Sequence, residues 1–591
     1  MIKGGEFLIK DQEAKDIFIP EEFGEDQLMM ASATKEFVEK ELDLHRERFE
    51  KKDYKLTEDC MKKAGELGLL GISVPAEYGG MGMPFNTSVL ICDKISGANG
   101  SFSTAFGAHT GIGTLPILLY GDDAQRTKYL PKLASGEWMG CYCLTEPGAG
   151  SDANSGKTKA VLTDDGKNYL ITGQKMWISN AGFADVFIVF ARIEDDKNIT
   201  GFILEKGMEG ITLGEEEQKL GLNSSSTRQV FFNDVKVPVE NLLGGRGNGF
   251  KIAMNALNVG RIKLSAAVLD ACRRVIGLST NYSNERIQFG IPIAKFGAIK
   301  HKLADMAVRT YAIESATYRA GAEIEKNILR LESEGVDHQE AHLKGIEEYA
   351  IECSIVKVLG SETIQFCSDE GIQIYGGMGY SADAPMEAAY RDARIARIYE
   401  GTNEINRMLL VGMILKKAMK GELDIMGPAM KVAEGLMSIP SFDKPDNSVL
   451  FEVEKEQIKK LKKAILMCAG KAAQHFAMTI EREQEVLMNL ADMVIEVYTA
   501  ESAILRAEKL ATKKGGQETE HQIAMSKLYL YQAIKNCNQS GEEVILSFAE
   551  GDEQRMLLMG LKRFTKGYTI NPKEMRRNIA AKLIEENKYC F

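Results

Sequence analysis

The spacing of apolar residues divides the chain into helical and β segments. Between residues 26 and 140, apolar residues recur at helical spacing over 26–49 and 57–70, with Gly and Pro turns between the runs. Thr57, followed by Glu58 and Asp59, is the expected N-cap of the second run. The pattern predicts a helical domain over 26–140, preceded by an N-terminal extension of residues 1–25.

The next hundred residues have the hydrophobic pattern of β-strands. Apolar residues alternate or run continuously over strand lengths at 168–175, 185–192, 200–206 and 228–237. The sequence Asp164-Asp165-Gly166-Lys167 is typical of a hairpin turn. No helical pattern separates these segments, so we expect an antiparallel β domain over 141–245 rather than a βαβ nucleotide fold. The glycine-rich stretch 244–249 is therefore predicted to be a loop leading into a helix, and not a dinucleotide fingerprint.

Helical spacing then returns for the rest of the chain. Runs at 251–282, 296–332 and 340–367 predict a second helical bundle over 246–420. Three prolines indicate a linker over 421–447, in which 424–439 is amphipathic and rich in Met. Residues 448–591 form a further helical domain without a cluster typical of catalysis. The predicted fold class is mainly α with a central antiparallel β domain and an additional C-terminal helical domain.

Composition narrows the function classes. A chain of 591 residues is too long for one hydrophobic core. The net charge of -11 argues against nucleic-acid binding, which needs a basic face. Ten cysteines without a C-x-x-C pair indicate reduced thiols rather than disulfides or a zinc site. The N-terminus lacks targeting features, and no apolar run reaches the length of a membrane span of about 18 residues. We therefore expect a cytoplasmic protein.

Two patterns have more than one interpretation. Residues 97–113 are crowded with Gly, Ala, Ser and Thr, and such small residues let either another helix or a long apolar ligand come close. Helix packing is the preferred interpretation from this segment alone. His338 and His342 have the i, i+4 spacing of a metal site, but they lie in a polar region between helices. We expect a solvated face there and no metal site.

Three groups of residues are typical of a cofactor enzyme. Residues 141–151, C-Y-C-L-T-E-P-G-A-G-S, form a Gly/Pro loop with free backbone N–H groups, paired with Trp177-Ile178-Ser179 at a strand end. Arg286-x-x-Phe289-Gly290 and the glycines after Gln373 suit a pyrophosphate and a close backbone approach. Glu400-Gly401-Thr402 breaks a helical pattern, and Thr402-Asn403 offers an N-cap for the next helix. Alone, such a glutamate is typical of a solvated surface.

Together these motifs closely resemble the acyl-CoA dehydrogenase family of flavoproteins. The motifs that carry the resemblance follow the family's order and spacing across residues 26–420: L-T-E-P-G-A-G-S-D (144–152), W-I-S-N (177–180), R-I-Q-F-G (286–290), Q-I-Y-G-G-M-G-Y (373–380) and Y-E-G-T-N-E-I (399–405). The C-terminal extension and the peptide Asn258-Val259-Gly260-Arg261 are similar to those of the very-long-chain branch.

The resemblance implies a helical bundle, a β-barrel-like domain and a second helical bundle, with FAD between the last two. It implies that Gln373 to Gly377 come from a partner subunit, and hence a homodimer or a dimer of dimers. Acyl-CoA would contact Ser151, Asn258, Arg261 and Gly401. Glu404 stands where the family usually has Gln, or Asp in the very-long-chain branch, so its side-chain contact stays open. The residues implied to bind FAD are Tyr142, Cys143, Leu144, Thr145, Gly150, Ser151, Trp177, Ile178, Ser179, Arg286, Gln288, Phe289, Phe296, Gly297, Gln373, Ile374, Gly376, Gly377, Thr402 and Glu404.

The reaction implied is α,β-dehydrogenation of a fatty acyl-CoA to a trans-2-enoyl-CoA in fatty acid β-oxidation. Glu400 would remove the α-proton, flavin N5 would take the β-hydride, and an electron-transfer flavoprotein would accept the electrons. Burial would raise the pKa of Glu400, and its backbone N–H with a ribityl hydroxyl would stabilise the enolate. Two branches of the family place the base one residue before the arginine; that position is Gly260 here, which cannot act as a base.

Several alternatives remain at this stage. An acyl-CoA oxidase would use the same residues, and some relatives with this C-terminal domain assemble respiratory complexes. The segment 424–439 has Lys431 as its only cation, so packing on a partner subunit is preferred to peripheral contact with the inner face of a membrane. The small residues at 97–107, Asn258 and the extra domain favour long acyl chains, while branched and dicarboxylic substrates stay open.

Overall fold

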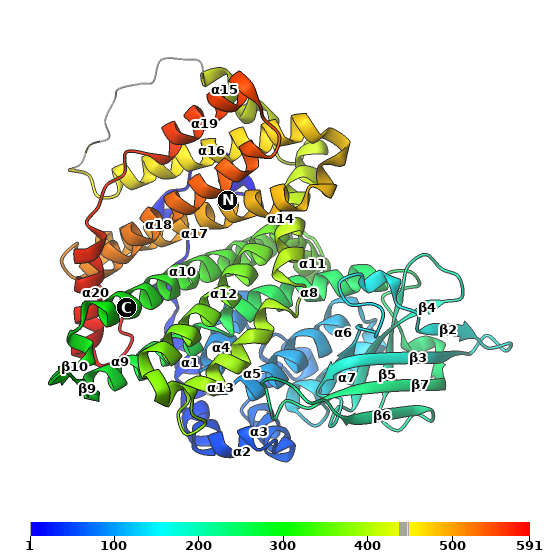
Figure 1. The fold of residues 1–591 in the computed structure, drawn as a ribbon. Helices are drawn as coiled ribbons and strands as arrows, with labels where there is room; N and C mark the ends of the chain where they lie inside the picture. Colours follow the sequence, from blue (N-terminus) through cyan, green and yellow to red (C-terminus); the bar gives the residue numbers. More distant parts are fainter. Residues whose placement is uncertain (1, 98, 437–445, 447) are drawn as a thin grey trace.

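The computed structural model describes residues 2–97, 99–436, 446 and 448–591. Figure 1 shows the β domain on one side of a helical body, with the C-terminal helices stacked on the opposite side of that body. The N-terminal helices lie at the junction with the β domain. They are α1 (Glu25–Phe37), α2 (Arg46–Glu50), α3 (Tyr54–Glu66), α4 (Phe85–Ile95), α5 (Gly100–Gly107), α6 (Leu115–Tyr120) and α7 (Asp123–Ser135).

The start of α3 differs from the expectation. The helix begins at Tyr54, and Asp53 caps it by accepting a hydrogen bond from the Leu56 backbone N–H. Thr57 is buried one turn later, where its hydroxyl donates to the Ser224 carbonyl at 2.9 Å. The prediction that Thr57 caps this helix was therefore wrong. Asp53, four residues earlier, offers a better acceptor to the first free backbone N–H groups of the helix.

The β domain is one sheet with the strand order β6-β7-β3-β2-β4-β5-β8, and β1 also pairs with β4. Most pairs are antiparallel, as expected, but β1 and β2 both pair in parallel with β4. Hydrophobic periodicity could not predict this parallel pairing. It indicates which residues of a strand are buried, but not which strand lies next to it. The strands are β1 (Gly140–Cys143), β2 (Lys159–Leu162), β3 (Asn168–Ser179), β4 (Val186–Ile193), β5 (Thr200–Glu205), β6 (Ile211–Glu216), β7 (Thr227–Pro238) and β8 (Leu242–Leu243).

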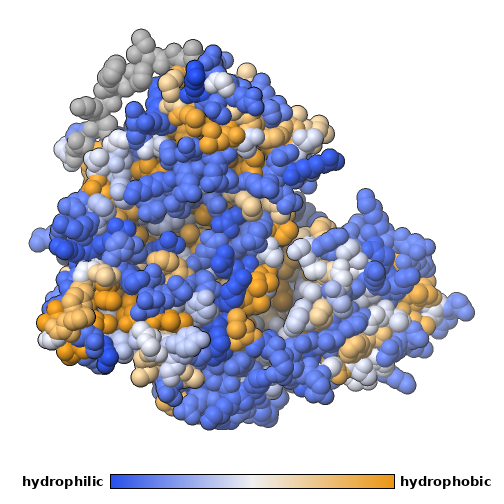
Figure 2. All heavy atoms as spheres, viewed as in Figure 1, coloured by the Kyte–Doolittle hydropathy of each residue, from blue (hydrophilic) through white to orange (hydrophobic). Residues whose placement is uncertain are grey.

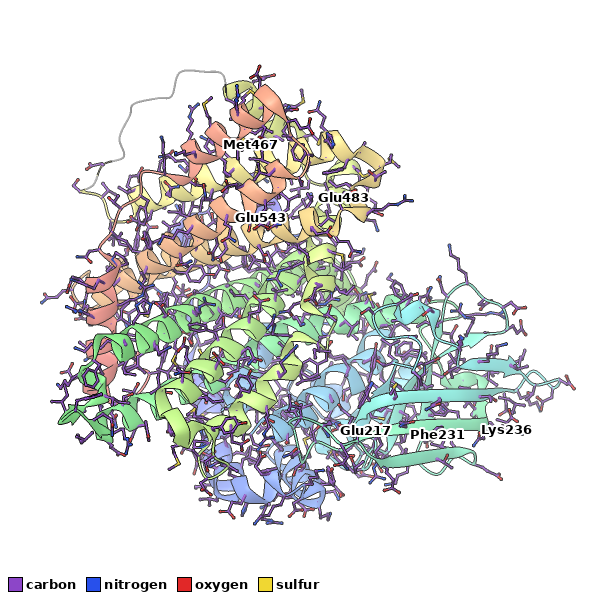
Figure 3. All side chains as sticks on the ribbon, viewed as in Figure 1. Glu217, Phe231, Lys236, Met467, Glu483 and Glu543 are labelled. Carbon is purple, nitrogen blue, oxygen red and sulfur yellow. The ribbon has the colours of Figure 1, made fainter. Side chains whose placement is uncertain are left out.

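Buried and exposed residues alternate along β7 on either side of an irregularity between Phe232 and Val235, where the β3–β7 register shifts. Val230 and Val235 are buried in the core of the domain, whereas Phe231 and Lys236 point away from it (Figure 3). The predicted turn after β2 is present, with Gly166 at a φ of 67° between two antiparallel strands. Residues 244–249 lead into a helix without a βαβ unit, as the sequence predicts.

The second bundle is built on two long helices. They are α10 (Gly297–Ser333) and α12 (Ala350–Tyr375), around which the shorter helices pack. A two-stranded hairpin, β9 (Ile287–Gln288) with β10 (Ile291–Pro292), follows α9. The other helices are α8 (Gly249–Ala266), α9 (Leu269–Glu285), α11 (His338–Glu348), α13 (Met386–Arg394) and α14 (Asn403–Met419).

The C-terminal helices dock on α10 through buried charge. Arg319 of α10 is fully buried and donates to Glu501 at 2.9 Å and to the Ser502 hydroxyl at 3.0 Å. The N-terminal extension is part of this junction, since Phe7 packs edge-on against Tyr498. The helices are α15 (Met426–Gly435), α16 (Glu452–Phe476), α17 (Gln484–Lys514), α18 (Glu520–Leu546), α19 (Gly551–Thr565) and α20 (Pro572–Glu586).

Of the amphipathic segment 424–439, residues 437–439 lie outside the described part of the chain. The remainder forms α15, which packs on α16 of its own chain, with Ala429 buried in the contact. Met426 and Met430 are exposed on its outer side. Among the described residues, no helix is long and apolar enough to cross a membrane.

Candidate active site

A cavity of about 450 Å³ lies between α5, α8, α9 and α13, and Glu400 forms part of its wall. Its lining is mainly apolar. The α8–α9 wall runs from Gly260 to Leu278, and Ser179 at the end of β3 closes the side nearest the β domain. The site therefore lies where the β domain meets the second bundle.

The small residues at 97–113 have two different roles. A Cβ on Gly107 or Gly111 would meet no atom within 4 Å, so both glycines face open space along the cavity wall. A Cβ on Gly97 or Gly100 would instead lie within 2.6 Å of a carboxylate oxygen of Asp270 or Asp392. The first pair makes room for a ligand and the second pair makes room for neighbouring helices, so both sequence interpretations hold at different positions.

Glu400 occupies a strained turn. Its φ is 58° and that of Gly401 is 81°, so two successive residues adopt the left-handed region that glycine tolerates and glutamate does not. The next helix, α14, begins immediately, with Thr402 as its N-cap accepting from the Ile405 N–H at 3.2 Å. The sequence predicted this cap. Strain of this kind persists only when surrounding contacts hold the turn in place.

Three side chains hold the backbone of the turn. The Asn406 side chain donates to the carbonyls of Glu400, Gly401 and Thr402 at 2.8–3.3 Å. Lys357 donates to the Gly401 carbonyl at 2.7 Å, and Arg261 donates to the Glu400 carbonyl at 3.3 Å. Sequence reasoning did not find Asn406 or Lys357, because each resembles an ordinary helix residue until the turn is in place.

The carboxylate itself is left free. Glu400 Oε2 is buried and has no hydrogen-bond partner among the described residues. Burial raises the pKa of Glu400 to about 7, although Arg261 and Lys357 act in the opposite sense. Burial likewise lowers the pKa of Lys357 to about 7, while Glu400 favours its charged form. An unpaired carboxylate with this pKa, facing a cavity, has the properties of a general base.

Arg261 and Asn258 lie behind the turn. Both are buried, and Arg261 donates to the Asn258 amide oxygen at 2.7 Å. The cavity wall includes Gly260 between them, but neither of the two side chains. The structure thus places them as supports of the Glu400 turn, while contact with acyl-CoA stays a prediction.

The Gly/Pro loop after β1 is fixed by a buried ion pair. Lys175 of β3 donates to Glu146 at 2.7 Å and to the Leu144 carbonyl at 3.0 Å. Burial disfavours the charged form of Glu146, but Lys175 and the Lys157 and Thr158 backbone N–H groups outweigh it and lower its pKa. The Glu of the loop motif therefore orders the loop. Lys175 was missed, because lysines on strands are usually solvated.

The loop leaves its polar face open. A Cβ on Gly148 or Gly150 would meet nothing within 4 Å, and Ser151 is exposed beside them. The Tyr142 hydroxyl is buried without a partner among the described residues, and its pKa is raised by burial and by Glu400 nearby. The Tyr142 hydroxyl is thus close to the Glu400 carboxylate, and the loop that follows Tyr142 has open space beside its glycines.

Trp177 projects from the end of β3 on a bulge. The β3–β7 register shifts between Lys175 and Ile178, and Trp177 takes a φ of 60°. Its indole is 51% exposed, although the next residue, Ile178, is buried in the β core. The bulge is joined to the loop by the Met176 N–H, which donates to the Thr145 carbonyl at 3.0 Å. The first predicted group, Tyr142 to Ser151 with Trp177 to Ser179, is thus brought together.

Thr402 and Glu404 lie beside Glu400 at the start of α14, but the other predicted cofactor residues lie elsewhere. Arg286, Gln288 and Phe289 are on or beside the β9–β10 hairpin, with Phe296 edge-on to Phe289; the hairpin lies at the opposite side of the chain from the β domain (Figure 1). Tyr375 stacks on Tyr282 at 4.1 Å, which places Gln373, Ile374, Gly376 and Gly377 at the same end as the hairpin. One chain therefore carries two separate halves of the predicted site.

The hairpin end is apolar and uncovered. Phe289 is 93% exposed, and Ile287, Met378 and Tyr380 are exposed nearby. Figure 2 shows apolar side chains gathered over the hairpin at the lower left of the molecule. Large exposed apolar patches are typical of protein interfaces.

The residues beside Glu400 fit a flavin cofactor. Open glycine backbone at Gly148 and Gly150, the unpartnered Tyr142 hydroxyl and the exposed Trp177 indole offer donors and an aromatic surface to a planar ring. Thr402, Gly401 and the exposed Glu404 lie at the start of α14, next to the base.

Comparisons with known protein families agree with this site. The models described as "Acyl-CoA dehydrogenase, N-terminal domain", "middle domain" and "C-terminal domain" match residues 24–137, 141–235 and 247–415. A second model, also described as "Acyl-CoA dehydrogenase, C-terminal domain", matches residues 460–563. The four matches cover the helical bundle, the β domain, the second bundle and the C-terminal helices in turn.

Individual relatives extend the similarity over the whole chain. A "Probable acyl-CoA dehydrogenase" of Bacillus subtilis is 44% identical, over 99% of this chain and 98% of the relative. A human "Very long-chain specific acyl-CoA dehydrogenase, mitochondrial" is 37% identical, over 77% of this chain and 70% of the relative. An acyl-CoA dehydrogenase complexed with FAD from Bacillus anthracis has a TM-score of 0.96 and 42% identity, covering 100% of both chains. The chain therefore belongs to the acyl-CoA dehydrogenase family, and it is an FAD-dependent acyl-CoA dehydrogenase.

Proposed function

We propose that the protein dehydrogenates long-chain fatty acyl-CoA at the α,β position, giving a trans-2-enoyl-CoA, with Glu400 as the base that removes the α-proton. The observation that carries the proposal is the Glu400 carboxylate, which forms part of the cavity wall with its Oε2 atom buried and without a hydrogen-bond partner among the described residues. The similarity to very-long-chain enzymes supports the same reaction class.

Residues of this chain prepare the proton transfer. The Asn406, Lys357 and Arg261 bonds hold the Glu400 turn, so that the carboxylate faces the cavity without a partner of its own. Desolvation raises the basicity of that carboxylate. Among the described residues the Glu400 backbone N–H has no acceptor, so it is the expected donor to the thioester oxygen, where negative charge develops. When bound, FAD supplies the acceptor for the β-hydride.

The dimensions of the cavity support a long acyl chain. From Gly260, opposite the base, to Arg274 near the far end, the α8–α9 wall spans 14 residues, or about 20 Å at the helical rise of 1.5 Å. An extended chain advances roughly 1.2 Å per bond, so about sixteen bonds fit in that length. Gly107 and Gly111 widen the opposite wall.

A homodimer would complete the site. The hairpin half and the β-domain half of the predicted FAD site are separated within one chain, and a two-fold assembly brings the first half of one copy to the second half of the other. The exposed apolar hairpin is the surface that such an assembly would bury. The Met426 and Met430 side of α15 supplies a second apolar face, for which a partner subunit or a lipid surface would be the occupant.

The test is identification of the product and the electron acceptor. Purified holoenzyme is mixed anaerobically with acyl-CoAs from butanoyl to eicosanoyl, and flavin bleaching and enoyl-CoA formation are followed. We expect bleaching to increase towards long chains, and reoxidation by an electron-transfer flavoprotein to be much faster than reoxidation by oxygen. Equal reoxidation by oxygen would identify an acyl-CoA oxidase instead, and bleaching only by short chains would contradict the long-chain assignment.

A further inference from the structure

Lys263 is a buried cation on the wall of the acyl cavity. It lies three residues after Gly260 on α8, on the same face and about one turn further from Glu400. Its side chain is 7% exposed, and it has no hydrogen-bond or ion-pair partner among the described residues. The other charged residues of the wall (Asp43, Arg46, Glu50, Arg274 and Asp392) are each bonded, for example Arg274 to Asp43 at 2.6 Å. Lys263 and Glu400 are therefore the two unpaired charged groups of the described wall.

The surroundings do not satisfy this cation. Cys92, Phe106 and Leu264 are its neighbours along the cavity, and burial lowers the pKa of Lys263. A void of about 10 Å³ on its other side is lined by Thr110 and Thr114, which is room for about one water molecule. Both hydroxyls donate to helix carbonyls, and among the described residues neither makes a hydrogen bond with Lys263. A buried ammonium group without an acceptor is costly, and a ligand that carries one would remove the cost.

We propose that Lys263 forms a polar subsite within the acyl cavity, which pairs with a carboxylate carried by the acyl chain, so that the enzyme also takes ω-carboxylated acyl-CoAs of medium length. The proposal rests on the proposed acyl-CoA site. The carboxylate must lie several carbons from the thioester, because Lys263 is about one helical turn beyond the residue that faces the base. Chains without a carboxylate would pass along the same wall.

The test measures binding separately from turnover. In FAD-loaded Glu400→Gln protein, flavin absorbance gives the Kd of octanoyl-CoA and of its ω-carboxylated counterpart, suberoyl-CoA. The same titrations are repeated with Lys263→Met, Lys263→Arg and, as a matched wall variant, Leu264→Met. We expect Lys263→Met to weaken suberoyl-CoA relative to octanoyl-CoA about tenfold or more. Lys263→Arg should keep most of the preference, and Leu264→Met should change both ligands alike.

Two results would overturn the subsite. One is an unchanged ratio of the two Kd values in Lys263→Met, which would mean that the cation is satisfied by water in the adjoining void. The other concerns the Glu400→Gln protein in which Lys263 is intact. If it does not bind suberoyl-CoA at concentrations at which octanoyl-CoA saturates the same site, the subsite is ruled out. Failure of the proposed reaction would instead appear as absent flavin bleaching in the Glu400 enzyme with every acyl-CoA, whatever residue stands at 263.

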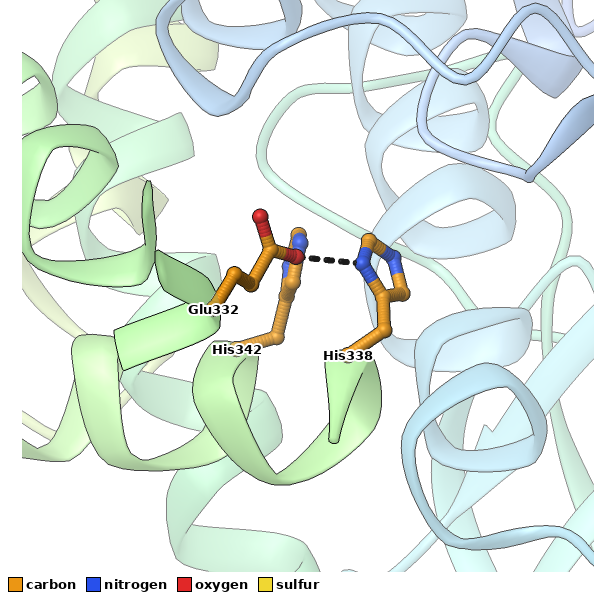
Figure 4. A group of neighbouring side chains, drawn as sticks. All are labelled: Glu332, His338 and His342. Carbon is orange, nitrogen blue, oxygen red and sulfur yellow. Dashed lines mark hydrogen bonds and ion pairs between the residues drawn. The ribbon is translucent and has the colours of Figure 1, made fainter. Parts of the chain in front are cut away.

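A separate cluster lies where α10 meets α11. Glu332 near the end of α10, and His338 and His342 at the start of α11, place one donor atom each within 4.8 Å of one another (Figure 4). His338 Nδ1 lies 2.5 Å from Glu332 Oε1, and the two imidazole rings are 4.4 Å apart. The sequence alone favoured a solvated face for the two histidines; the turn at Gly335 brings Glu332 back as a third donor.

The donor set suits a zinc-like cation. Two imidazoles and one carboxylate, with an open position for water, form a common set of zinc ligands. Glu332 and His342 are half-buried and His338 is exposed, so the three donor atoms are accessible to an ion from solvent. We infer that Glu332, His338 and His342 form a divalent transition-metal site that ties the end of α10 to α11.

Zinc titration of the holoenzyme tests this site. Competition with a chromophoric chelator gives stoichiometry and affinity, and thermal unfolding gives the stabilisation. We expect one zinc ion per chain, a higher Tm with zinc, and at least about tenfold weaker binding in His342→Asn. His301→Asn is the matched control, because His301 pairs with Asp305 outside the cluster and should leave binding unchanged. Equal zinc affinity in the His338→Asn, His342→Asn double variant would overturn the assignment.

Discussion

Gly260 and Glu400 are matched in shape: a Cβ on Gly260 would lie 2.6 Å from Glu400 Oε2 and 2.8 Å from its carboxyl carbon. A carboxylate in the Glu400 position therefore needs a residue without a side chain opposite it. A side chain at position 260 and the Glu400 carboxylate therefore exclude each other, which agrees with the proposed role of Glu400 as the base.

The first prediction concerns this contact. Gly260→Ala should lower kcat about tenfold to a hundredfold, because the carboxylate must move by several tenths of an ångström and proton abstraction depends steeply on position. FAD content should stay unchanged. Gly412→Ala on α14 is the control, since its Cβ would meet nothing within 4 Å. A Gly260→Ala enzyme with wild-type kcat would show that the carboxylate does not work from the place described.

The pH dependence follows from the raised pKa of Glu400. The base must be unprotonated, so kcat/KM should rise with pH through about 7 and level off above it. Lys357 favours the charged carboxylate, so Lys357→Met should move this acid limb to higher pH. Lys357 also has a pKa of about 7, so the two groups titrate together. The acid limb of the wild-type profile therefore reports the coupled Glu400–Lys357 pair and not Glu400 alone. A limb centred near 4.5 would contradict the burial of the base.

The C-terminal domain should depend on Arg319. Arg319 pairs with Glu323 and with Glu501. Glu501 would keep its pair with Lys462 at 2.6 Å, but Glu323 would be left buried without a cation among the described residues. Arg319→Met should therefore cost about 3–5 kcal/mol in the free energy of unfolding.

Arg330→Met on the same helix breaks an exposed pair with Glu334 and two hydrogen bonds to the Asn327 amide oxygen, and should cost less, about 1–2 kcal/mol. Urea unfolding of both variants measures the difference. Equal losses would show that the domain is held by apolar contacts alone.

The two halves of the cofactor site predict complementation between subunits. Glu400→Gln and Arg286→Glu should each inactivate a homodimer. A mixed dimer would contain one site with both defects and one with neither, so co-expression should restore about a quarter of wild-type activity. If Arg286 acts on the cofactor of its own chain, every site in the mixture is defective and no activity returns.

The sequence anticipated the parts of the site that depend on local order. The break at Glu400-Gly401, the Thr402 cap and the loop after β1 are all readable, because Gly and capping residues act within a few positions along the chain. The roles of Asn406, Lys357 and Lys175 could not be predicted from the sequence. Each acts by reaching backbone carbonyls that only the tertiary fold brings close.

The same limit applies to the fold. Strand periodicity located β3, β4, β5 and β7, but the parallel pairing of β1 and β2 with β4 depends on connections far apart in the chain. The family resemblance assigned Gln373 to a partner subunit but made no such assignment for Arg286, and within one chain both lie far from the β domain. Sequence order carries no information about which copy of the chain supplies a residue.

The most direct measurement of the central claim is the anaerobic reaction of a long-chain acyl-CoA, such as palmitoyl-CoA, with wild-type and Glu400→Gln holoenzymes. Both should bind the ligand, seen as a shift of the flavin spectrum, because the substitution keeps the shape of the side chain. Only the wild type should then lose its flavin absorbance rapidly and form the enoyl product. Bleaching of the Glu400→Gln flavin at the wild-type rate would contradict the assignment of Glu400 as the base.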